Sequence, residues 1–586
     1  MGTPAASKPT PLDPVTLAVL QGRLEQIADE MDATLFRSAF NPIIAEAHDA
    51  SHGLYDALTG DTLIQGKSGL PIFVGVMAFA VKAVIDKARA EGGPNPGDIY
   101  IFNDAWDGGT HLSDFKLVKP VFRGGALNCY LASVGHWHDV GGNVPGNYNP
   151  VATESFQEGM VIPPVKLFEN GELRQDIVAI MQANSRLPGS LYGDLNGQIN
   201  ALELGEARLN ALLDEYGDAL VANAMKELRE RAANVMQGLV ADLPDGVFSA
   251  EDWLDNDGIT DEPLAVALDL QVQGDTLTLD FSRTAMACAG PVNISKSTAI
   301  AACYVALKHV FTDVPANAGV LDPVAFVIAD GSLLDARPPR PVGGYTETIL
   351  RLIDVVFVAL SKAAPERVNG CAYGTINALS IAGYRGDGSR WVMFSFFGGG
   401  HGGHPAGDGL NHGNAPISMA TMPPLEILEA AYPVRFTQWA LRQDSAGPGQ
   451  HRGGCGAVYE LELLAREATG FLFGERGKYA PPGVAGGAGG ALNRFTYPTA
   501  AGGQNPPMVS KMVDIQLQRG QRLRLETPGG GGYGPAHRRD AEAVADDVRL
   551  GYVSAAVARI AYRCVIAADG TLDAVETKRL RAETAP

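Results

Sequence analysis

The first ninety residues carry two helical patterns of hydrophobic residues. Asp13 and Pro14 form a typical helix start, in which a capping side chain precedes proline at the first helical position. Apolar residues then recur at spacings of three and four: Leu17, Leu20, Leu24, Ile27 and Met31. This spacing predicts an amphipathic helix with one buried face. A second, more apolar helix is expected over residues 72–90.

The longest periodic segment lies at residues 193–216. Its apolar residues again follow helical spacing: Leu195, Ile199, Leu202, Leu209 and Leu212. Gly217 is a C-terminal stop signal, and a further helix is expected directly after it, over residues 220–236. Two helices with so short a connection predict an antiparallel helical hairpin, which serves core packing and interfaces rather than chemistry.

From about residue 243 the pattern changes to strands. Residues 264–271 and 276–281 alternate apolar and polar positions on either side of a Gln-Gly-Asp turn, which predicts a hairpin. Helical patterns return at 300–311 and 349–364. Because strands and helices alternate without a regular βαβ period, the predicted fold class is α+β, multi-domain, with a helical hairpin and glycine-rich mixed β-sheet regions.

Three domains are expected on this basis. Residues 1–242 form an N-terminal metal-site domain with the helical hairpin, and residues 243–432 form a central α+β domain. Residues 433–586 form a C-terminal β-rich region that ends in a helical docking tail. At 586 residues the chain is long enough for two or more hydrophobic cores.

Composition narrows the functional classes. The net charge of -20 argues against nucleic acid or an anionic membrane as a partner. No apolar run approaches the roughly 18 residues of a membrane span, and the first dozen residues lack a signal-peptide core, so we expect a cytoplasmic protein. The six scattered cysteines contain no Cys-x-x-Cys pair, which predicts reduced structural thiols. The chain is unusually rich in glycine, with 70 residues, and the glycine clusters at 398–403, 453–456, 482–490 and 529–534 indicate loop-rich β structure.

The candidate chemistry is concentrated between Asn103 and Gly146. His111, Asp114, His136, His138 and Asp139 fall within 29 positions, although the whole chain has only 11 histidines. Residues 115–122 and 129–134 are predicted to be the strands of a hairpin. Two imidazoles and a carboxylate at adjacent strand ends are a common way to hold a divalent cation with one position left for water. The alternative is that these side chains only hydrogen-bond loop backbones.

Two other segments contain groups of ionisable residues. Glu46, His48, Asp49 and His52 lie within seven positions after the first helix, which again suggests a site. In the C-terminal third, Arg452 stands between glycines, where it could meet a carboxylate or phosphate. The simpler interpretation of this motif is an ion pair between Asp444 and the arginine beside it, which holds a loop.

Neither glycine motif that suggests nucleotide binding satisfies its requirements. Residues 66–68 end like a P-loop, but Asp61 occupies the position of the required glycine. Residues 398–403 match Gly-x-Gly-x-x-Gly, yet Pro405 follows where a helix must begin. We interpret residues 398–413 as a flexible substrate-side loop that His401 and His404 line.

Several motifs resemble the hydantoinase B/oxoprolinase family over nearly the full chain. The matching segments are AEAHDAS (45–51), NDAWDGGTHLSDFKLVKPVF (103–122), HWHDVGG (136–142), GDLNGQINALELGEARL (193–209), DFSRT (280–284), GPVN (290–293), DSAGPGQHRGGCG (444–456) and TPGGGGYG (527–534). One departure is Phe394 to Phe397, which replaces a usual Glu-Thr-x-Gly-Gly-Gly pattern and predicts an altered substrate pocket. Phe396, Phe397, Trp106 and Trp137 hint that this pocket is apolar.

The resemblance implies a ligand set. Asp49 is the best match for a further ligand beside His111, Asp114 and His136, and Glu46 is the runner-up or the base beside the metal. His138 and Asp139 are expected to orient a ligand imidazole. Four protein ligands and a bound water suit manganese, iron or five-coordinate zinc.

The resemblance also implies a function. Family members include subunits of ATP-dependent hydantoinases and lactamases, parts of 5-oxoprolinases, and subunits of acetone and acetophenone carboxylases. We therefore expect a metal-dependent subunit of an ATP-dependent cyclic amidohydrolase, in which a hydantoinase A-like partner binds ATP and activates the amide. An α2β2 complex is expected. The alternatives are a subunit of an ATP-dependent ketone carboxylase and a non-catalytic structural subunit.

Overall fold

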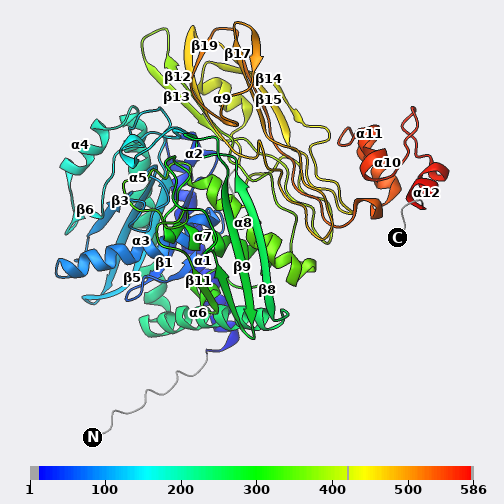
Figure 1. Cartoon of the computed structure of the whole chain (residues 1–586). Coiled ribbons are helices and arrows are strands. Elements are labelled where there is room, and N and C mark those ends of the chain that lie inside the picture. The colour runs from blue at the N-terminus through cyan, green and yellow to red at the C-terminus, as the bar shows by residue number, and fades with distance from the viewer. Residues whose placement is uncertain (1–11, 419–420, 583–586) are drawn as a thin grey trace.

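The computed structural model describes residues 12–418 and 421–582 and confirms an α+β fold. A lower body of helices and sheets carries a β-sandwich at the top, and three short helices stand at one side near the C-terminus (Figure 1). The described residues contain four sheets, and the seven-stranded sheet of the body positions the candidate chemistry.

The seven-stranded sheet is antiparallel, in the order β2-β1-β5-β4-β3-β6-β7. Its strands are β1 (Ala50–Asp56), β2 (Thr62–Gln65), β3 (Ile99–Phe102), β4 (Asp114–Arg123), β5 (Ala126–His136), β6 (Val165–Glu169) and β7 (Glu172–Leu173). The hairpin β4–β5 is the one predicted from residues 115–134, with each strand longer than the sequence indicated. The extra residues include two of the candidate ligands, Asp114 and His136.

Helices from three parts of the chain cover one face of this sheet. They are α1 (Pro14–Ser38), α5 (Pro188–Tyr216) and the first half of α6 (Asp218–Ala241), with α2 (Pro42–Ala45) and α4 (Gln175–Ala183) beside them. The Asp13 side chain caps α1 by accepting from the backbone N–H of Thr16, as predicted. All five predicted apolar positions of α1 are buried. The helical hairpin is also confirmed, with α5 beginning five residues earlier than expected, at Pro188.

The other face of the sheet packs on α3 (Pro71–Ala90); α7 (Lys296–Val310) packs on α3, and α8 (Tyr345–Ala363) packs on α7. A second sheet, in the order β11-β10-β9-β8, covers these helices. Its strands are β8 (Gly246–Leu254), β9 (Leu264–Gln273), β10 (Thr276–Asp280) and β11 (Val324–Val327). One hydrophobic core therefore includes residues on both sides of the expected domain boundary at 242/243. The division into three domains stays a prediction.

The β-sandwich consists of two further sheets around a separate hydrophobic core. One has the order β13-β12-β16-β19, from β12 (Ala378–Tyr384), β13 (Arg390–Ser395), β16 (Glu467–Phe473) and β19 (Lys511–Gln518). The other has the order β14-β15-β20-β17-β18, from β14 (Val434–Leu441), β15 (Ala457–Leu463), β17 (Arg494–Thr499), β18 (Gly502–Gln504) and β20 (Arg522–Glu526). Helix α9 (Leu425–Ala431) packs beside β14.

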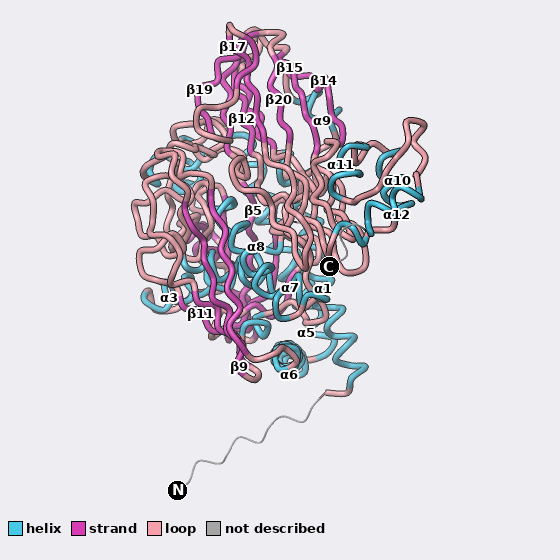
Figure 2. The backbone as a smooth tube through the Cα atoms, turned by 45° about the vertical axis from the view of Figure 1, so that its right-hand side comes forward, coloured by secondary structure: helices cyan, strands magenta, loops and turns pink. Residues whose placement is uncertain are grey.

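The glycine clusters form extended segments that lie side by side without being strands, and they run as long loops below the sandwich (Figure 2). Backbone hydrogen bonds join them, for example from Gly403 N to Gly531 O (2.9 Å) and from Gly454 N to His401 O (2.7 Å). A Cβ on Gly402 would lie 1.7 Å from the carbonyl oxygen of Gly370. Because only glycine permits this spacing, residues 398–413 are a packed layer and not the flexible loop we expected.

The chain ends in α10 (Ala541–Arg549), α11 (Ala555–Ala561) and α12 (Ala574–Ala582), which share a small core of their own. The sequence analysis predicted a helical tail at this end of the chain, and these helices form it. All six cysteines are buried and free, in agreement with the expected thiols. Within the described ranges, no helix has both the length and the apolar character needed to cross a membrane.

Candidate metal centre

The site lies where the hairpin β4–β5 ends. Asp114 is the first residue of β4, His136 is the last residue of β5, and the two are direct partners across the ladder. On the other side of β5, the backbone N–H of His136 donates to the carbonyl of Asp49, which directly precedes β1. The sheet register therefore brings together three side chains that are far apart in the sequence.

His111 completes the group from the turn that leads into β4. Its Nδ1 lies 2.9 Å from Asp114 Oδ2, and His136 Nδ1 lies 3.3 Å from Asp114 Oδ1. The centroids of the two imidazole rings are 4.9 Å apart. The ligand atoms of His111, Asp114 and His136 all lie within 4.8 Å of one another, and within residues 12–418 and 421–582 no other group of at least three such side chains meets this spacing.

The electrostatics of Asp114 suit a cation site. Burial by itself would raise the pKa of this carboxyl. The imidazoles of His111 and His136 more than offset this effect and hold the pKa well below its ordinary value, so Asp114 is ionised at neutral pH. The Thr110 hydroxyl also donates to Asp114 Oδ2. A buried, ionised carboxylate between two nitrogen donors is the chemistry that a divalent ion requires.

Unpartnered atoms show that these residues fit a metal. The Nδ1 atoms of both imidazoles are directed at the Asp114 carboxylate. The Nε2 atoms of His111 and His136, however, are buried and lack a hydrogen-bond partner in the described structure. Leaving two such atoms unpaired costs about 1–3 kcal/mol each, and a cation bound through Nε2 would remove that cost.

Asp49 faces the same site from the side. It lines a small cavity of about 30 Å³ together with His136. Burial raises the pKa of Asp49 to about 7, and the neighbouring Asp114 contributes to the rise while His136 opposes it. Asp49 is not part of the three-residue cluster, so the structure brings together three of the four predicted ligands and leaves the fourth at the cavity wall.

Aromatic and aliphatic side chains enclose this cavity. The His136 ring lies 5.7 Å from the Phe394 ring, and the His111 ring lies 4.7 Å from the Tyr345 ring. The full lining is Asp49, Leu70, Ile72, His136, Tyr148, Tyr345, Thr346, Ile376, Phe394, Phe396, Asn414, Ile417 and Ser418. Burial raises the pKa values of Tyr148 and Tyr345 well above the ordinary value, so both phenols stay protonated. The site is therefore largely apolar and shielded from bulk water.

The three predicted catalytic residues lie outside the cavity lining. Glu46 ends α2, and its backbone carbonyl accepts from the Thr421 hydroxyl. His138 is buried next to β13, and burial lowers its pKa to about 4, which keeps the imidazole neutral. Asp139 pairs with Arg186 at 3.0 Å and also accepts backbone N–H groups of its own loop. These contacts engage Asp139 in holding the loop.

The predicted substrate-binding residues lie in the extended glycine-rich segments, His401 and His404 within residues 398–413 and Arg452 within residues 444–456. His401 Nε2 is hydrogen-bonded to the carbonyl of Asn414, a residue of the cavity lining, whereas His404 sits in a local turn closed by Gly407. Arg452 pairs with Asp547 of α10 at 3.2 Å, and its guanidinium lies over the Tyr552 ring. Its guanidinium is thus occupied in attaching the C-terminal helices.

Sequence reasoning found part of the cavity wall. Phe396 lines the cavity, but Trp137 stacks on Phe115 with ring centroids 3.8 Å apart in the core beneath the helices, and Phe397 is buried in the separate core of the β-sandwich. Tyr148 and Tyr345 were missed. Tyr148 follows His136 within the same glycine-punctuated segment, which is a signal that could have found it. Tyr345 comes from the start of α8 and carried no such signal.

Comparison with known proteins places this geometry in a family. Residues 13–536 match the family described as hydantoinase B/oxoprolinase. The chain belongs to the hydantoinase B/oxoprolinase family. Among family relatives, the caprolactamase subunit beta of Pseudomonas jessenii is 34% identical over 590 residues, covering 97% of this chain and 99% of that protein.

Two solved structures have the same fold as this hydantoinase B/oxoprolinase family member. The ATP-dependent caprolactamase from Pseudomonas jessenii superposes with a TM-score of 0.88 at 32% identity, covering 98% of this chain and 100% of that one. Nucleotide-free acetone carboxylase gives a TM-score of 0.88 at 21% identity, covering 97% of this chain and 83% of the other. The second likeness concerns the fold alone.

Proposed function

We propose that this chain is the metal-dependent subunit of an ATP-dependent cyclic amidohydrolase of the hydantoinase, oxoprolinase or lactamase type. The observation that carries the proposal is the buried cluster of His111, Asp114 and His136 in a family that includes the caprolactamase beta subunit. A partner subunit resembling hydantoinase A binds ATP and activates the amide, and two copies of each subunit assemble as α2β2. The chain itself offers no credible phosphate-binding loop, which supports this division of labour.

In this proposal His111, Asp114 and His136 hold one divalent cation, which is manganese, zinc or iron. When bound, such a cation polarises a carbonyl oxygen and lowers the pKa of a coordinated water toward neutrality. Asp114 carries the negative charge of the set, because its pKa is held low in the folded protein. The hairpin register fixes Asp114 opposite His136, so the ligand spacing does not depend on a loop.

Asp49 takes the proton of the attacking water. Its carboxylate lines the cavity beside His136. Burial raises the pKa of Asp49 to about 7, a nearby dication acts in the opposite direction, and the ionised carboxylate is the form that accepts a proton. We therefore assign Asp49 to proton transfer, although the resemblance had suggested a fourth ligand.

The apolar wall orients the ring and keeps out bulk water. Tyr148, Phe394 and Phe396 provide flat surfaces beside His136, and Ile72 and Ile417 close the cavity. Excluding water strengthens every electrostatic interaction inside and protects an activated amide from uncatalysed loss.

The proposal is tested by co-expressing the chain with a hydantoinase A-like subunit and measuring metal content and ATP hydrolysis with lactams, hydantoins and ketones. We expect stoichiometric metal and ATP hydrolysis coupled to ring opening of a cyclic amide, without any need for bicarbonate. A requirement for bicarbonate together with a ketone would show a carboxylase. Coupled activity that survives in a folded His111→Ala variant would show a structural subunit.

A further inference from the structure

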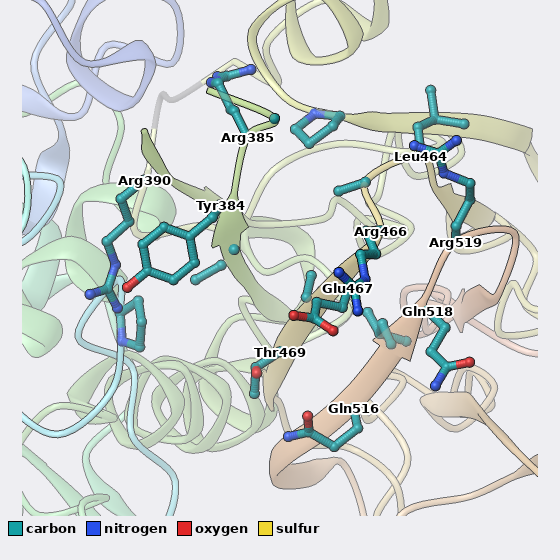
Figure 3. Close-up of a pocket in the computed structure, with 18 of the residues that line it drawn as sticks. Tyr384, Arg385, Arg390, Leu464, Arg466, Glu467, Thr469, Gln516, Gln518 and Arg519 are labelled. Carbon is teal, nitrogen blue, oxygen red and sulfur yellow. The ribbon is translucent and has the colours of Figure 1, made fainter. Parts of the chain in front are cut away.

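A large cleft opens on the β-sandwich, at the end of the sheet β13-β12-β16-β19 (Figure 3). Its volume is about 910 Å³, compared with about 30 Å³ for the cavity at the candidate metal centre. Tyr384 and Arg390 form one wall, and Arg466 and Arg519 form the other. None of the residues discussed above as catalytic or metal-binding lines it.

Four arginines surround this cleft without carboxylate partners. Arg385 donates to the carbonyl of Ala431, and the Arg390 guanidinium lies over the Tyr384 ring at 5.8 Å. In the part of the chain that the structure describes, none of Arg385, Arg390, Arg466 and Arg519 forms an ion pair, although Glu467 and Asp514 line the same cleft. All four arginines are exposed.

In the other sheet of the sandwich, β14-β15-β20-β17-β18, arginines do have carboxylate partners. There Arg435 and Arg522 pair with Glu462, and Arg524 pairs with Glu460. Three arginines of that sheet are thus paired with carboxylates on adjacent strands. At the cleft, four arginines without ion pairs stand together on a chain whose net charge is -20, and this local positive charge favours an anionic partner.

The floor of the cleft can bind an extended peptide. Thr469 of β16 and Gln516 and Gln518 of β19 are polar and stand on the sheet (Figure 3). Strand β19 is the last strand of its sheet, so one side of its backbone is free of ladder hydrogen bonds. A segment of a few residues in extended conformation would fit this volume and these donors and acceptors.

Because the four arginines are exposed, a protein segment is a better ligand for the cleft than a small anion. A solvent-exposed guanidinium contributes little to a single ion pair, because water and salt screen the charge. A protein segment with several carboxylates engages many such groups at once and buries them as it docks. Charge complementarity of this kind sets orientation and association rate.

The cleft also lies close to the candidate metal centre. Arg390 at the cleft and Phe394 at the metal-site cavity are four residues apart on β13, which is about 13 Å along a strand. Pro145 lines the cleft, and Tyr148 lines the cavity three residues later. A partner seated in the cleft would therefore lie next to the reaction site.

We infer that this cleft is the docking site for an acidic segment of the ATP-binding partner subunit. The inference rests on the proposed function, because it takes its partner from there. Docking at this place would bring the subunit that activates the amide against the strands that carry the wall of the metal site.

The test uses the double variant R466E/R519E and the purified hydantoinase A-like subunit. At low salt, we expect the dissociation constant of R466E/R519E for this subunit to be roughly tenfold or more above that of the wild type. The dissociation constant of the neutral variant R466Q/R519Q should lie between the two. Association of the wild type should weaken more steeply than that of R466E/R519E as NaCl rises from about 50 mM to about 300 mM. The matched control is R231E, which reverses an exposed arginine on α6, at the far end of the molecule from the sandwich (Figure 1).

Metal content separates this inference from the proposed function. R466E/R519E should keep the metal content of the wild type, because the cleft lies outside the ligand cluster. Unchanged association of R466E/R519E, with a wild type that assembles normally, would overturn the docking site and leave the function standing. Failure of the wild type to assemble would overturn both. Tight binding of tripolyphosphate that both double variants lose, with association unaffected, would show a phosphate site instead.

Discussion

Asp114 and His136 are cross-strand partners at the open end of one β-hairpin, and their side chains meet with His136 Nδ1 3.3 Å from Asp114 Oδ1. This relationship fixes two of the three cluster residues by backbone hydrogen bonds. His111 joins them from the turn that begins three residues before β4. The centre is therefore built on rigid elements, which is the condition for holding a ligand geometry within a fraction of an ångström.

Replacing His111 by alanine should remove the metal. The variant loses one of three ligand side chains, so its affinity should fall by more than the 10–100-fold that loss of an outer partner costs. Metal content after dialysis, measured by mass spectrometry, checks this. His404→Ala is the matched control, because His404 lies in a local turn away from the cluster and its variant should retain the metal. Equal metal content in both variants would contradict the ligand set.

Asp49→Asn should slow amide hydrolysis without reducing metal binding. Since Asp49 lies outside the three-residue cluster, the variant should keep most of its metal, whereas amide hydrolysis should fall by about 100-fold or more because the proton acceptor is gone. Metal analysis and ring-opening rates on the same preparation measure the two effects. Loss of both the metal and the activity in this variant would show that Asp49 is a metal ligand.

The buried Glu158 should make stability depend on pH. Burial raises its pKa from 4.5 to about 8, although the backbone N–H groups of Val342 and Gly343 donate to it. Between these pH values the folded state holds a proton that the unfolded state has lost, so the free energy of unfolding should fall as pH rises from about 4.5 to about 8. Urea unfolding at pH 5 and pH 8 should show a decrease on the order of a few kcal/mol from this group. Glu158→Gln should flatten that slope, and an unchanged slope in the variant would count against the assignment.

A single methyl group added inside the packed glycine-rich segments should lower the stability of the protein. In Gly402→Ala the new Cβ would lie 1.7 Å from the Gly370 carbonyl oxygen, so the backbone must move and the protein should lose about 3 kcal/mol or more. Gly386→Ala is the control, because nothing lies within 4 Å of its Cβ position, and its effect should stay within about 0.5 kcal/mol. Chemical denaturation of both variants measures the difference. Similar stabilities of the two variants would show that these segments can move apart to accommodate the methyl group.

Arg452→Gln should loosen the C-terminal helices and leave substrate binding alone. Arg452 is one of two guanidinium partners of Asp547, which keeps its pair with Arg539 at 2.9 Å, so removing Arg452 should cost about 1–3 kcal/mol locally. Hydrogen exchange should accelerate in α10 and α11, while KM for the amide stays unchanged. A raised KM with unchanged exchange would instead support the substrate contact that the sequence suggested.

Much of the centre could be predicted because it is local. Strand alternation around a turn predicted the hairpin, and the density of His and Asp at its ends predicted the cluster that the structure brings together. The ion-pair partner of Arg452 could not be predicted, because Asp547 is 95 residues away and no short-range pattern connects them. The same holds for Asp139, since Arg186 lies 47 residues further on.

The sequence by itself determined the helices, the hairpin and the identity of the three cluster residues, because periodicity and turn chemistry act over about ten residues. The tertiary structure decided which side chains share a cavity. Sheet order placed Asp49 beside His136 through β1 and β5, and helix α8 brought Tyr345 against His111. It also turned the glycine clusters from expected loops into packed layers, since close approach of backbones depends on neighbours that are far apart in the chain.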